Sequence, residues 1–463
     1  MWWRRISVPV MLSLTGCNLG PAYHKPDVPL PAAWTTASAT SEAAPPASDW
    51  WRGFGSSQLN DYIAQAQSAN DDIGAAMARV READAQARIA GAALLPNLSA
   101  SGTATRERAP SSTGGPLKTF DVFNPALLAS YQVDFWGHNR DLHNAALATA
   151  KASRFDRETV ALTVVTSVAM SYFEVLEFHD RLLVAQQNYQ NAMTILKGLE
   201  VEAEVGTATA LDVAQQATTV ANVNATIPPL QQQLRQSTDA LAILTGNAPE
   251  QLEPGDGTLD ALTLPAVGAG LPSQLLARRP DVAEAEAQLV SANANIAAAR
   301  AAFFPSINLT AGGGFESTAL GMLLSPETRI WDVSAGVTQT IFDHGALSGQ
   351  YQYSRARYDE LLSDYHKTVL TALGNVEDAL VAVQQTAEQQ LRQQDATDKA
   401  RRAFGFAQLQ FQAGTTDILT MLNTETALFT AQDALVQGKF AHTQALLTLY
   451  QALGGGWHQE QAR

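Results

Sequence analysis

The chain has one cysteine in 463 residues, and charged residues make up only 16% of it. A single cysteine excludes an intrachain disulfide. Acidic residues outnumber basic ones 45 to 30, so the formal net charge is −15. Because phosphate binding requires clustered Lys and Arg, this balance excludes a nucleic-acid partner. No uninterrupted run of about 18 apolar residues follows the N-terminus, so no transmembrane helix is expected. The HExxH, GxSxG and Walker patterns are also missing, so we expect no enzymatic activity, no metal site and no bound cofactor.

The N-terminus has the pattern of an export signal. Arg4 and Arg5 precede a short apolar stretch, and a small residue, Gly16, ends it. The sequence Leu14-Thr-Gly-Cys17 resembles the lipobox of bacterial lipoproteins, in which the cysteine becomes the first mature residue and carries the acyl chains. This resemblance predicts a lipoprotein signal peptide over residues 1–16 and a covalent lipid on Cys17. The alternative is a chance cysteine after a plain signal peptide.

An internal duplication organises the rest of the chain. Three landmarks of the first half recur in the second at offsets of 209, 207 and 208 residues: Pro96 as Pro305, Phe135 as Phe342, and Gly206 as Gly414. Three landmarks at nearly one offset indicate two copies of one structural unit.

Each half contains two segments in which apolar and polar residues alternate over roughly 9–11 positions. That period is typical of a strand with one apolar and one polar face. We expect the strands at about 97–106, 120–136, 306–316 and 330–342. Four strands do not close a barrel, and lipid does not tolerate an open sheet edge, so membrane-spanning strands would require several copies of the chain. Four aromatic residues could form an interfacial girdle or simply pack on the strands: Tyr131, Trp136, Phe315 and Trp331.

Long helical patterns flank the strands. Sustained heptads of Val and Leu predict helices that pack on helices. We expect helices at about 59–94, 139–205, 211–245, 281–303 and 418–453, together with a second long helix after Gly345. Gly206 and Gly414 would let the chain reverse direction between the long helices and the returning ones. Four threonines are candidate caps for the returning helices: Thr207 or Thr209, and Thr415 or Thr416.

The lipobox, the strand pairs, the long helical hairpins and the duplication together resemble one family. That family is the TolC-like outer-membrane factors of bacterial tripartite efflux systems, in the NodT-type outer-membrane lipoprotein branch. Three local segments are similar to motifs of the branch: Gly20-Pro-Ala-Tyr23, Trp50-Trp-Arg-Gly-Phe54 and Ala277-Arg-Arg-Pro-Asp-Val282. The resemblance covers residues 17 to about 456.

The resemblance implies a mainly α protein with a membrane β-barrel. In the family, a homotrimer closes a twelve-stranded β-barrel in the outer membrane, and twelve helices continue it as an α-barrel tunnel across the periplasm. It also implies the following division of the chain: signal peptide 1–16, lipidated N-terminal segment at the equatorial region 17–58, first efflux repeat 59–246, linker 247–271, second efflux repeat 272–456 and tail 457–463.

The function implied by the resemblance is that of a passive exit duct for drugs or other small toxic compounds, and hence antibiotic resistance. The partners implied are a periplasmic adaptor (membrane fusion) protein, an inner-membrane RND pump and outer-membrane lipid, with the lipid on Cys17 as the only attached group. The turns at Gly206 and Gly414 would be periplasmic tips where the adaptor docks. Two alternatives are an exit duct for type I polypeptide secretion and a structural envelope lipoprotein without a pore. The alternating strands argue against the second alternative.

Two acids beside the tips are candidate gate residues. In a trimer, Asp212 and Asp417 would each form a ring of three carboxylates, and charged rings at a constriction select ions by sign. The alternative role is to complement the positive end of a helix dipole. Some members of the family carry a polar clamp, and an additional acid, at positions occupied here by Phe411, Thr416 and Asn423. The same polar closure of the tip is therefore not expected in this chain.

Overall fold

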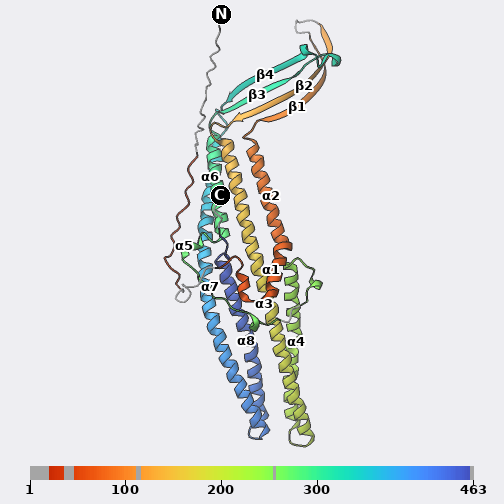
Figure 1. Cartoon of the computed structure of the whole chain (residues 1–463), viewed down its shortest axis with the longest axis vertical. Helices are drawn as coiled ribbons and strands as arrows, with labels where there is room; N and C mark the ends of the chain where they lie inside the picture. The colour runs from red at the N-terminus through yellow and green to blue at the C-terminus, as the bar shows by residue number, and fades with distance from the viewer. Residues whose placement is uncertain (1–19, 36–45, 111–115, 254–256, 459–463) are drawn as a thin grey trace. The chain divides into compact units, whose positions relative to one another are not determined.

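The computed structural model describes residues 20–35, 46–110, 116–253 and 257–458; the predicted signal peptide and Cys17 lie outside these ranges. The described residues form a duplicated series of helix, strand pair, long helix and returning helix (Figure 1). The elements of the first repeat are α1 (Ser57–Ala69), α2 (Asp71–Ala92), β1 (Asn97–Pro110), β2 (Leu117–Val133), α3 (His138–Glu204) and α4 (Ala210–Leu244). Those of the second are α5 (Pro272–Leu275), α6 (Pro280–Ala301), β3 (Ser306–Phe315), β4 (Arg329–Thr338), α7 (Ala346–Gln412) and α8 (Ile418–Ala452).

The chain divides into two compact units, and both repeats contribute to each of them. The first unit consists of Met1–Asp27, Arg79–Ser153 and Glu284–Tyr365, and it contains the four strands. The second consists of Val28–Ala78, Arg154–Ala283 and His366–Arg463, and it contains the helical turns and the returning helices. The duplication is therefore built into both units.

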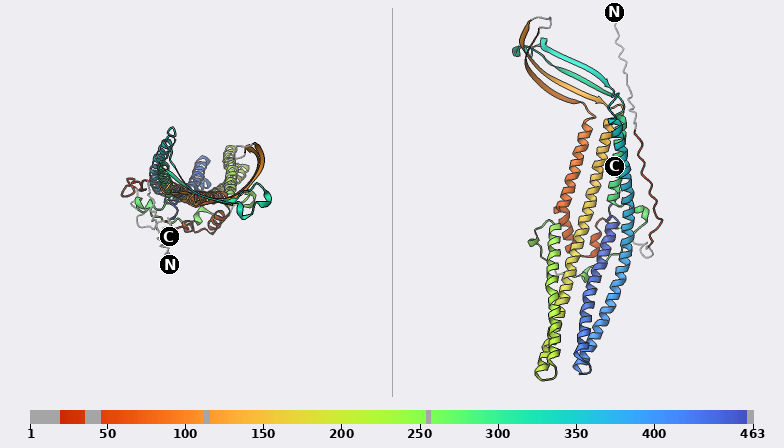
Figure 2. Two further views of the ribbon diagram at one scale, coloured as in Figure 1. Left: turned by 90° about the horizontal axis from the view of Figure 1, so that it is seen from above. Right: turned by 180° about the vertical axis from the view of Figure 1, so that it is seen from behind.

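The first unit contains one antiparallel sheet with the order β1-β2-β3-β4, and Figure 2 shows it curving across its width. Its register places Leu127 of β2 opposite Ala100 of β1 and Gly313 of β3, so the apolar residues of successive strands share one face. On the other face, the hydroxyl oxygens of Thr310 and Ser334 lie 2.6 Å apart. The predicted alternation of an apolar and a polar face is confirmed.

Helix caps set the ends of the strands, and these ends differ from the predicted ones. β2 ends at Val133, before the predicted 136, because Asp134 turns toward α3 and accepts hydrogen bonds from the amides of Asn139 and Arg140. β4 ends at Thr338, before the predicted 342, and Asp343 caps α7 in the same way. β1 instead continues to Pro110, beyond the predicted 106.

Trp136 is not part of a strand, although it was a candidate for the aromatic girdle. Its indole nitrogen donates to the carbonyl oxygen of Pro305 at 2.8 Å, and its ring stacks on Phe304. Trp136 therefore ties the end of β2 to the start of β3. Trp331 does lie on the apolar face of the sheet, where it is 78% exposed in the single chain.

The second unit contains the larger part of two helical hairpins, α3–α4 and α7–α8, which lie side by side in Figures 1 and 2. Both long helices have 67 residues and both returning helices have 35. Buried residues such as Val168 on α3 and Val376 on α7 confirm the predicted heptad seams. Leu370 and Leu391 follow the same heptads but are 59% and 72% exposed. Parts of these seams thus have no partner in the single chain.

The helix predicted over 59–94 is two helices, α1 and α2, separated at Asn70. The Asn70 side-chain oxygen accepts hydrogen bonds from the amides of Asp72 and Ile73, and its nitrogen donates to the carbonyl of Leu244 at 3.0 Å. An asparagine that caps a new helix in this way interrupts the preceding one.

Among the described residues, α3 is long and apolar enough to cross a membrane by length and composition alone, since an 18-residue window reaches a mean hydropathy of 1.6. No such helix was expected from the sequence, because that expectation required an uninterrupted apolar run, whereas this window allows up to two charged residues. Half of the window is buried within the chain. Packing within the helical unit therefore accounts for much of its apolar character.

Candidate functional site

The two hairpin turns have the same backbone geometry. Gly206 and Gly414 take positive φ angles of 82° and 68°, in the left-handed region where glycine carries no steric cost. The amides of Thr207 and Thr415 donate to carbonyls five residues earlier, those of Glu202 and Gln410. Both turns are therefore glycine-terminated helix ends, as the sequence predicts.

The two candidate gate acids occupy different positions in their turns. Thr209 caps α4, and Asp212 three residues later accepts a hydrogen bond from the Thr209 amide at 2.8 Å, forming a capping box. Asp417 is itself the cap of α8 and accepts from the Thr420 amide at 2.9 Å. Of the four candidate threonine caps, only Thr209 caps a helix. In the second repeat, the position equivalent to Thr209 is occupied by Asp417.

Asp417 is fully exposed, and its hydrogen bonds from the side chain and the amide of Thr420 lower the pKa of its carboxyl. It therefore carries its negative charge at neutral pH in the single chain. The structure thus gives both Asp212 and Asp417 a helix-capping role, which was the alternative to gating.

An apolar cluster joins the two hairpins near their turns. Leu199 of α3 packs with Met421 and Leu422 of α8, and Phe411 lies against this cluster. Phe411 occupies a position where a polar clamp was considered in the sequence. The contact between the hairpins at this level is hydrophobic.

A buried polar layer lies beyond this cluster, at Gln216 on α4 and Glu425 on α8. Both side chains are 0% exposed. The Gln216 nitrogen donates to the carbonyl of Ala192 on α3 at 2.9 Å. Burial raises the pKa of the Glu425 carboxyl to about 7, while the Gln216 side chain acts in the opposite direction.

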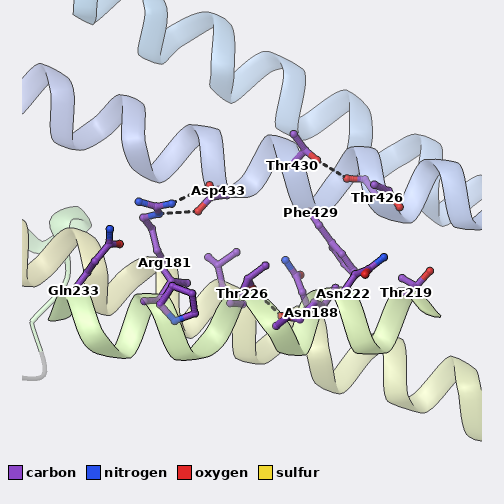
Figure 3. A pocket seen from close by; sticks show the side chains of 16 residues that line it. Arg181, Asn188, Thr219, Asn222, Thr226, Gln233, Thr426, Phe429, Thr430 and Asp433 are labelled. Atoms are coloured by element: carbon purple, nitrogen blue, oxygen red, sulfur yellow. Dashed lines mark hydrogen bonds and ion pairs between the residues drawn. The ribbon is translucent and has the colours of Figure 1, made fainter. Parts of the chain in front are cut away.

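An ion pair also connects the hairpins. The Arg181 guanidinium on α3 donates to both carboxylate oxygens of Asp433 on α8, at 2.8 and 3.3 Å, and to Glu177 one turn earlier at 3.3 Å. Burial raises the pKa of Glu177, and Arg181 partly offsets that effect. Figure 3 shows the guanidinium and the Asp433 carboxylate facing each other between the two helices.

A cavity of about 640 Å³ lies beside the ion pair, since Arg181 and Asp433 are among its lining residues. α3, α4 and α8 line it, and Figure 3 shows Phe429 reaching from α8 toward α4. Its other side chains include Asn188, Thr219, Asn222, Thr226, Thr426 and Thr430. The walls of this cavity thus combine polar and apolar side chains, whereas the contact nearer the turns is apolar.

Heptad analysis missed the four polar residues that connect the hairpins, because it counts apolar positions. Gln216 and Glu425 occupy seam positions between apolar residues, so an acid or amide in a seam was the available signal. Arg181 and Asp433 are 252 residues apart, and no local pattern indicates that they meet.

His138 and His143 each bond to a backbone carbonyl, that of Ala298 and that of Ala87. No group of three or more His, Cys, Asp or Glu side chains suited to a metal ion occurs in the part of the chain that the structure describes.

The chain belongs to the outer membrane efflux protein family, whose model matches residues 62–247 and 271–455. It is an efflux channel component of the outer membrane and not an enzyme, which confirms the family, the fold class and the function predicted from the sequence.

Two curated relatives match nearly the whole chain. The pyoverdine export outer membrane protein OpmQ of Pseudomonas aeruginosa is 38% identical, over 98% of this chain and 97% of its own. The toluene efflux pump outer membrane protein TtgC of Pseudomonas putida is 33% identical, over 96% of this chain and 94% of its own.

Solved structures share the fold. The outer-membrane channel OprN superimposes with a TM-score of 0.90 at 25% identity, covering 95% of this chain and all of that one. The open state of the Neisseria gonorrhoeae MtrE outer membrane channel gives a TM-score of 0.87 at 27% identity, covering 96% of this chain and all of that one.

Proposed function

We propose that three copies of the chain assemble into one passive duct, with a twelve-stranded barrel and twelve helices around a continuous lumen. The observation that supports this most directly is the sheet. Its outer strands, β1 and β4, have no partner on their outer edges among the described strands, while one face is apolar and exposed. Lipid does not tolerate unpaired strand edges, so β4 of one chain would pair with β1 of the next until the barrel closes.

The exposed seam residues on α7 support the same assembly. Leu370 and Leu391 belong to heptads but remain exposed in the single chain. A neighbouring chain would cover them and complete the seam, since long helices gain most of their stability from packing.

The Gly206 and Gly414 turns would then be the periplasmic tips that receive the adaptor protein, with an inner-membrane pump behind it. In this trimer, Asp212 and Asp417 would form rings of carboxylates near the lumen while they also cap their helices. A lipid on Cys17 would add a second membrane anchor beside the barrel. The division of the chain into 17–58, two repeats and the 247–271 linker belongs to the same proposal.

The substrates would be small molecules. OpmQ is named for pyoverdine export and TtgC for toluene efflux, so relatives of similar identity serve chemically different compounds. A wide passive lumen makes few specific contacts, and the choice of substrate would therefore lie with the pump that loads the duct.

Cysteine pairs across the outer sheet edges test the closure. One cysteine on β1 and one on β4 are three strand spacings apart within a chain, roughly 14 Å, whereas a disulfide requires Cα atoms within about 7 Å. A scan of such pairs should therefore give covalent dimers and trimers and no intrachain bond. The pair Ala100→Cys with Leu127→Cys lies on adjacent strands and serves as the intrachain control.

In a mild detergent, the purified protein should have the mass of a trimer, and it should conduct ions in planar bilayers. A uniform monomer, or a scan in which no β1–β4 pair forms cross-linked trimers, would contradict the shared barrel.

A further inference from the structure

The polar layer between the hairpins contains hydrogen-bonding atoms without partners. The Gln216 nitrogen donates to the carbonyl of Ala192, but its side-chain oxygen has no hydrogen-bond partner. Neither carboxyl oxygen of Glu425 has a partner, although the residue is 0% exposed. Buried polar groups in proteins are nearly always paired, because an unpaired one loses its hydration without replacement.

A proton on Glu425 would resolve this deficit. A neutral carboxyl has one O–H donor, and the unpaired oxygen of Gln216 is an acceptor, so each would satisfy the other. An ionised carboxylate offers only acceptors. The Gln216 side chain favours this form, since it lowers the pKa of Glu425, but burial without a counter-ion outweighs that effect. The layer is therefore compatible with close hairpins when Glu425 is protonated and unfavourable when it is ionised.

No charged side chain balances Glu425 from the packed helices. Burial and Gln216 are the only causes that shift the pKa of its carboxyl. The charged residues on the neighbouring stretches of α3, α4 and α7 are exposed or half-buried: Lys197, Glu200, Asp212, Asp398, Lys399, Arg401 and Arg402. On α8 itself, Asp433 is engaged by Arg181.

We propose that Gln216 and Glu425 form a proton-operated latch between the α3–α4 and α7–α8 hairpins, closed when Glu425 is protonated and released when it ionises. This inference rests on the proposed duct, because separation of the hairpins would widen the lumen at the tips. The cavity would give the released carboxylate access to water, since its lining includes Thr426, directly after Glu425, and Thr219, three residues after Gln216.

The sign of the pH dependence follows from the proton. The pKa of Glu425 in the latched chain is about 7, above its ordinary value of 4.5. The free energy that favours the latched state is therefore largest below pH 4.5 and falls as the pH rises from 4.5 to 7. Above pH 7 it stays at this lower value. The duct should open more readily at neutral and alkaline pH than at acidic pH.

Single-channel recording in planar bilayers at pH 5.5 to 8.5 tests the latch. The open probability of the native trimer should rise by at least about tenfold over this range. Glu425→Gln keeps the shape and supplies a permanent N–H donor, so this variant should stay mostly closed with no pH response. The matched control is Glu200→Gln, which removes an exposed acid of α3 and should keep the native response.

Infrared difference spectroscopy gives a second readout that does not depend on conduction. The carbonyl band of a protonated carboxyl should disappear with a midpoint near pH 7 in the native protein and be missing from Glu425→Gln. Gln216→Leu removes the acceptor and should raise the open probability at pH 5.5.

The outcomes separate the latch from the duct. A native channel that conducts equally at all pH values, or a Glu425→Gln variant that keeps the native pH response, would overturn the latch and leave the duct intact. A trimer that conducts at no pH, while the infrared band titrates as expected, would overturn the duct and leave the protonated layer intact.

Discussion

Replacing Arg181 with methionine removes an ion pair that connects α3 of one hairpin to α8 of the other. Methionine keeps much of the arginine stem, so the loss falls mainly on the two hydrogen bonds to Asp433 and the one to Glu177. The pKa of Glu177, already raised by burial, should then rise further, because Arg181 lowers it in the native chain. We expect a looser contact between α3 and α8.

The exposure of the partners sets the magnitude. The side chains of Arg181 and Asp433 are 20% and 39% exposed, so the pair is weaker than a fully buried one. Exposed pairs contribute about 0.2–1 kcal/mol and hydrogen bonds to charged groups about 1.5–3 kcal/mol. An intermediate value of about 1 kcal/mol per chain gives about 3 kcal/mol for a trimer that opens in one step. That corresponds to a change of roughly a hundredfold in the ratio of open to closed channels.

Open probability in planar bilayers measures this ratio directly. Arg235→Met is the matched control, because Arg235 pairs with Asp239 on the same helix at 2.9 Å and connects no hairpins. Arg181→Met should open much more often than the native channel at one pH, and Arg235→Met should not. Equal open probabilities for Arg181→Met and Arg235→Met would refute the idea that this pair restrains the hairpins.

Three further changes have defined outcomes. Cys17→Ser should abolish incorporation of labelled palmitate while the protein remains in the outer membrane, and persistent labelling would contradict the lipid anchor. Asp417→Asn should reduce cation preference, read as a smaller reversal potential in asymmetric KCl, with a smaller effect for Asp212→Asn; equal potentials for the native and Asp417→Asn channels would restrict Asp417 to helix capping. Phe54→Ala should destabilise the helical unit by about 3–5 kcal/mol, because Phe54 is 0% exposed and packs on Phe173 and Tyr450, and an unchanged thermal midpoint in detergent would refute that estimate.

The sequence predicted those features that depend on local periodicity. Strand and helix periods are properties of 10–20 neighbouring residues, so the four strands and the long helices followed from them. The predicted turns at Gly206 and Gly414 also followed, because a positive φ angle strongly favours glycine.

Features that depend on side-chain hydrogen bonds at element ends were predicted less well. Asn70 divides one predicted helix into two because its side chain replaces the backbone bonds at the start of α2. Asp134 ends β2 early for a similar reason. Short polar residues have this effect only when the surrounding chain places the amide groups within reach, which a period does not indicate.

The periodicity of the sequence did not predict which residues of the two hairpins meet. Glu425 follows the heptad of α8 as an apolar residue would, and Gln216, the other buried residue of the polar layer, lies in the other repeat. Only the packing of the two copies of the unit against each other brings these residues together.

The equal lengths of the duplicated hairpins have a consequence for symmetry. With 67 and 35 residues in both copies, the trimer that we propose would present six tips of nearly the same reach, arranged with approximate sixfold symmetry on a true threefold axis. The tips alternate in chemistry, since one kind is capped by Thr209 with Asp212 and the other by Asp417. A docking partner with sixfold repetition would therefore find two classes of quasi-equivalent sites, and a threefold partner could select one class by its cap.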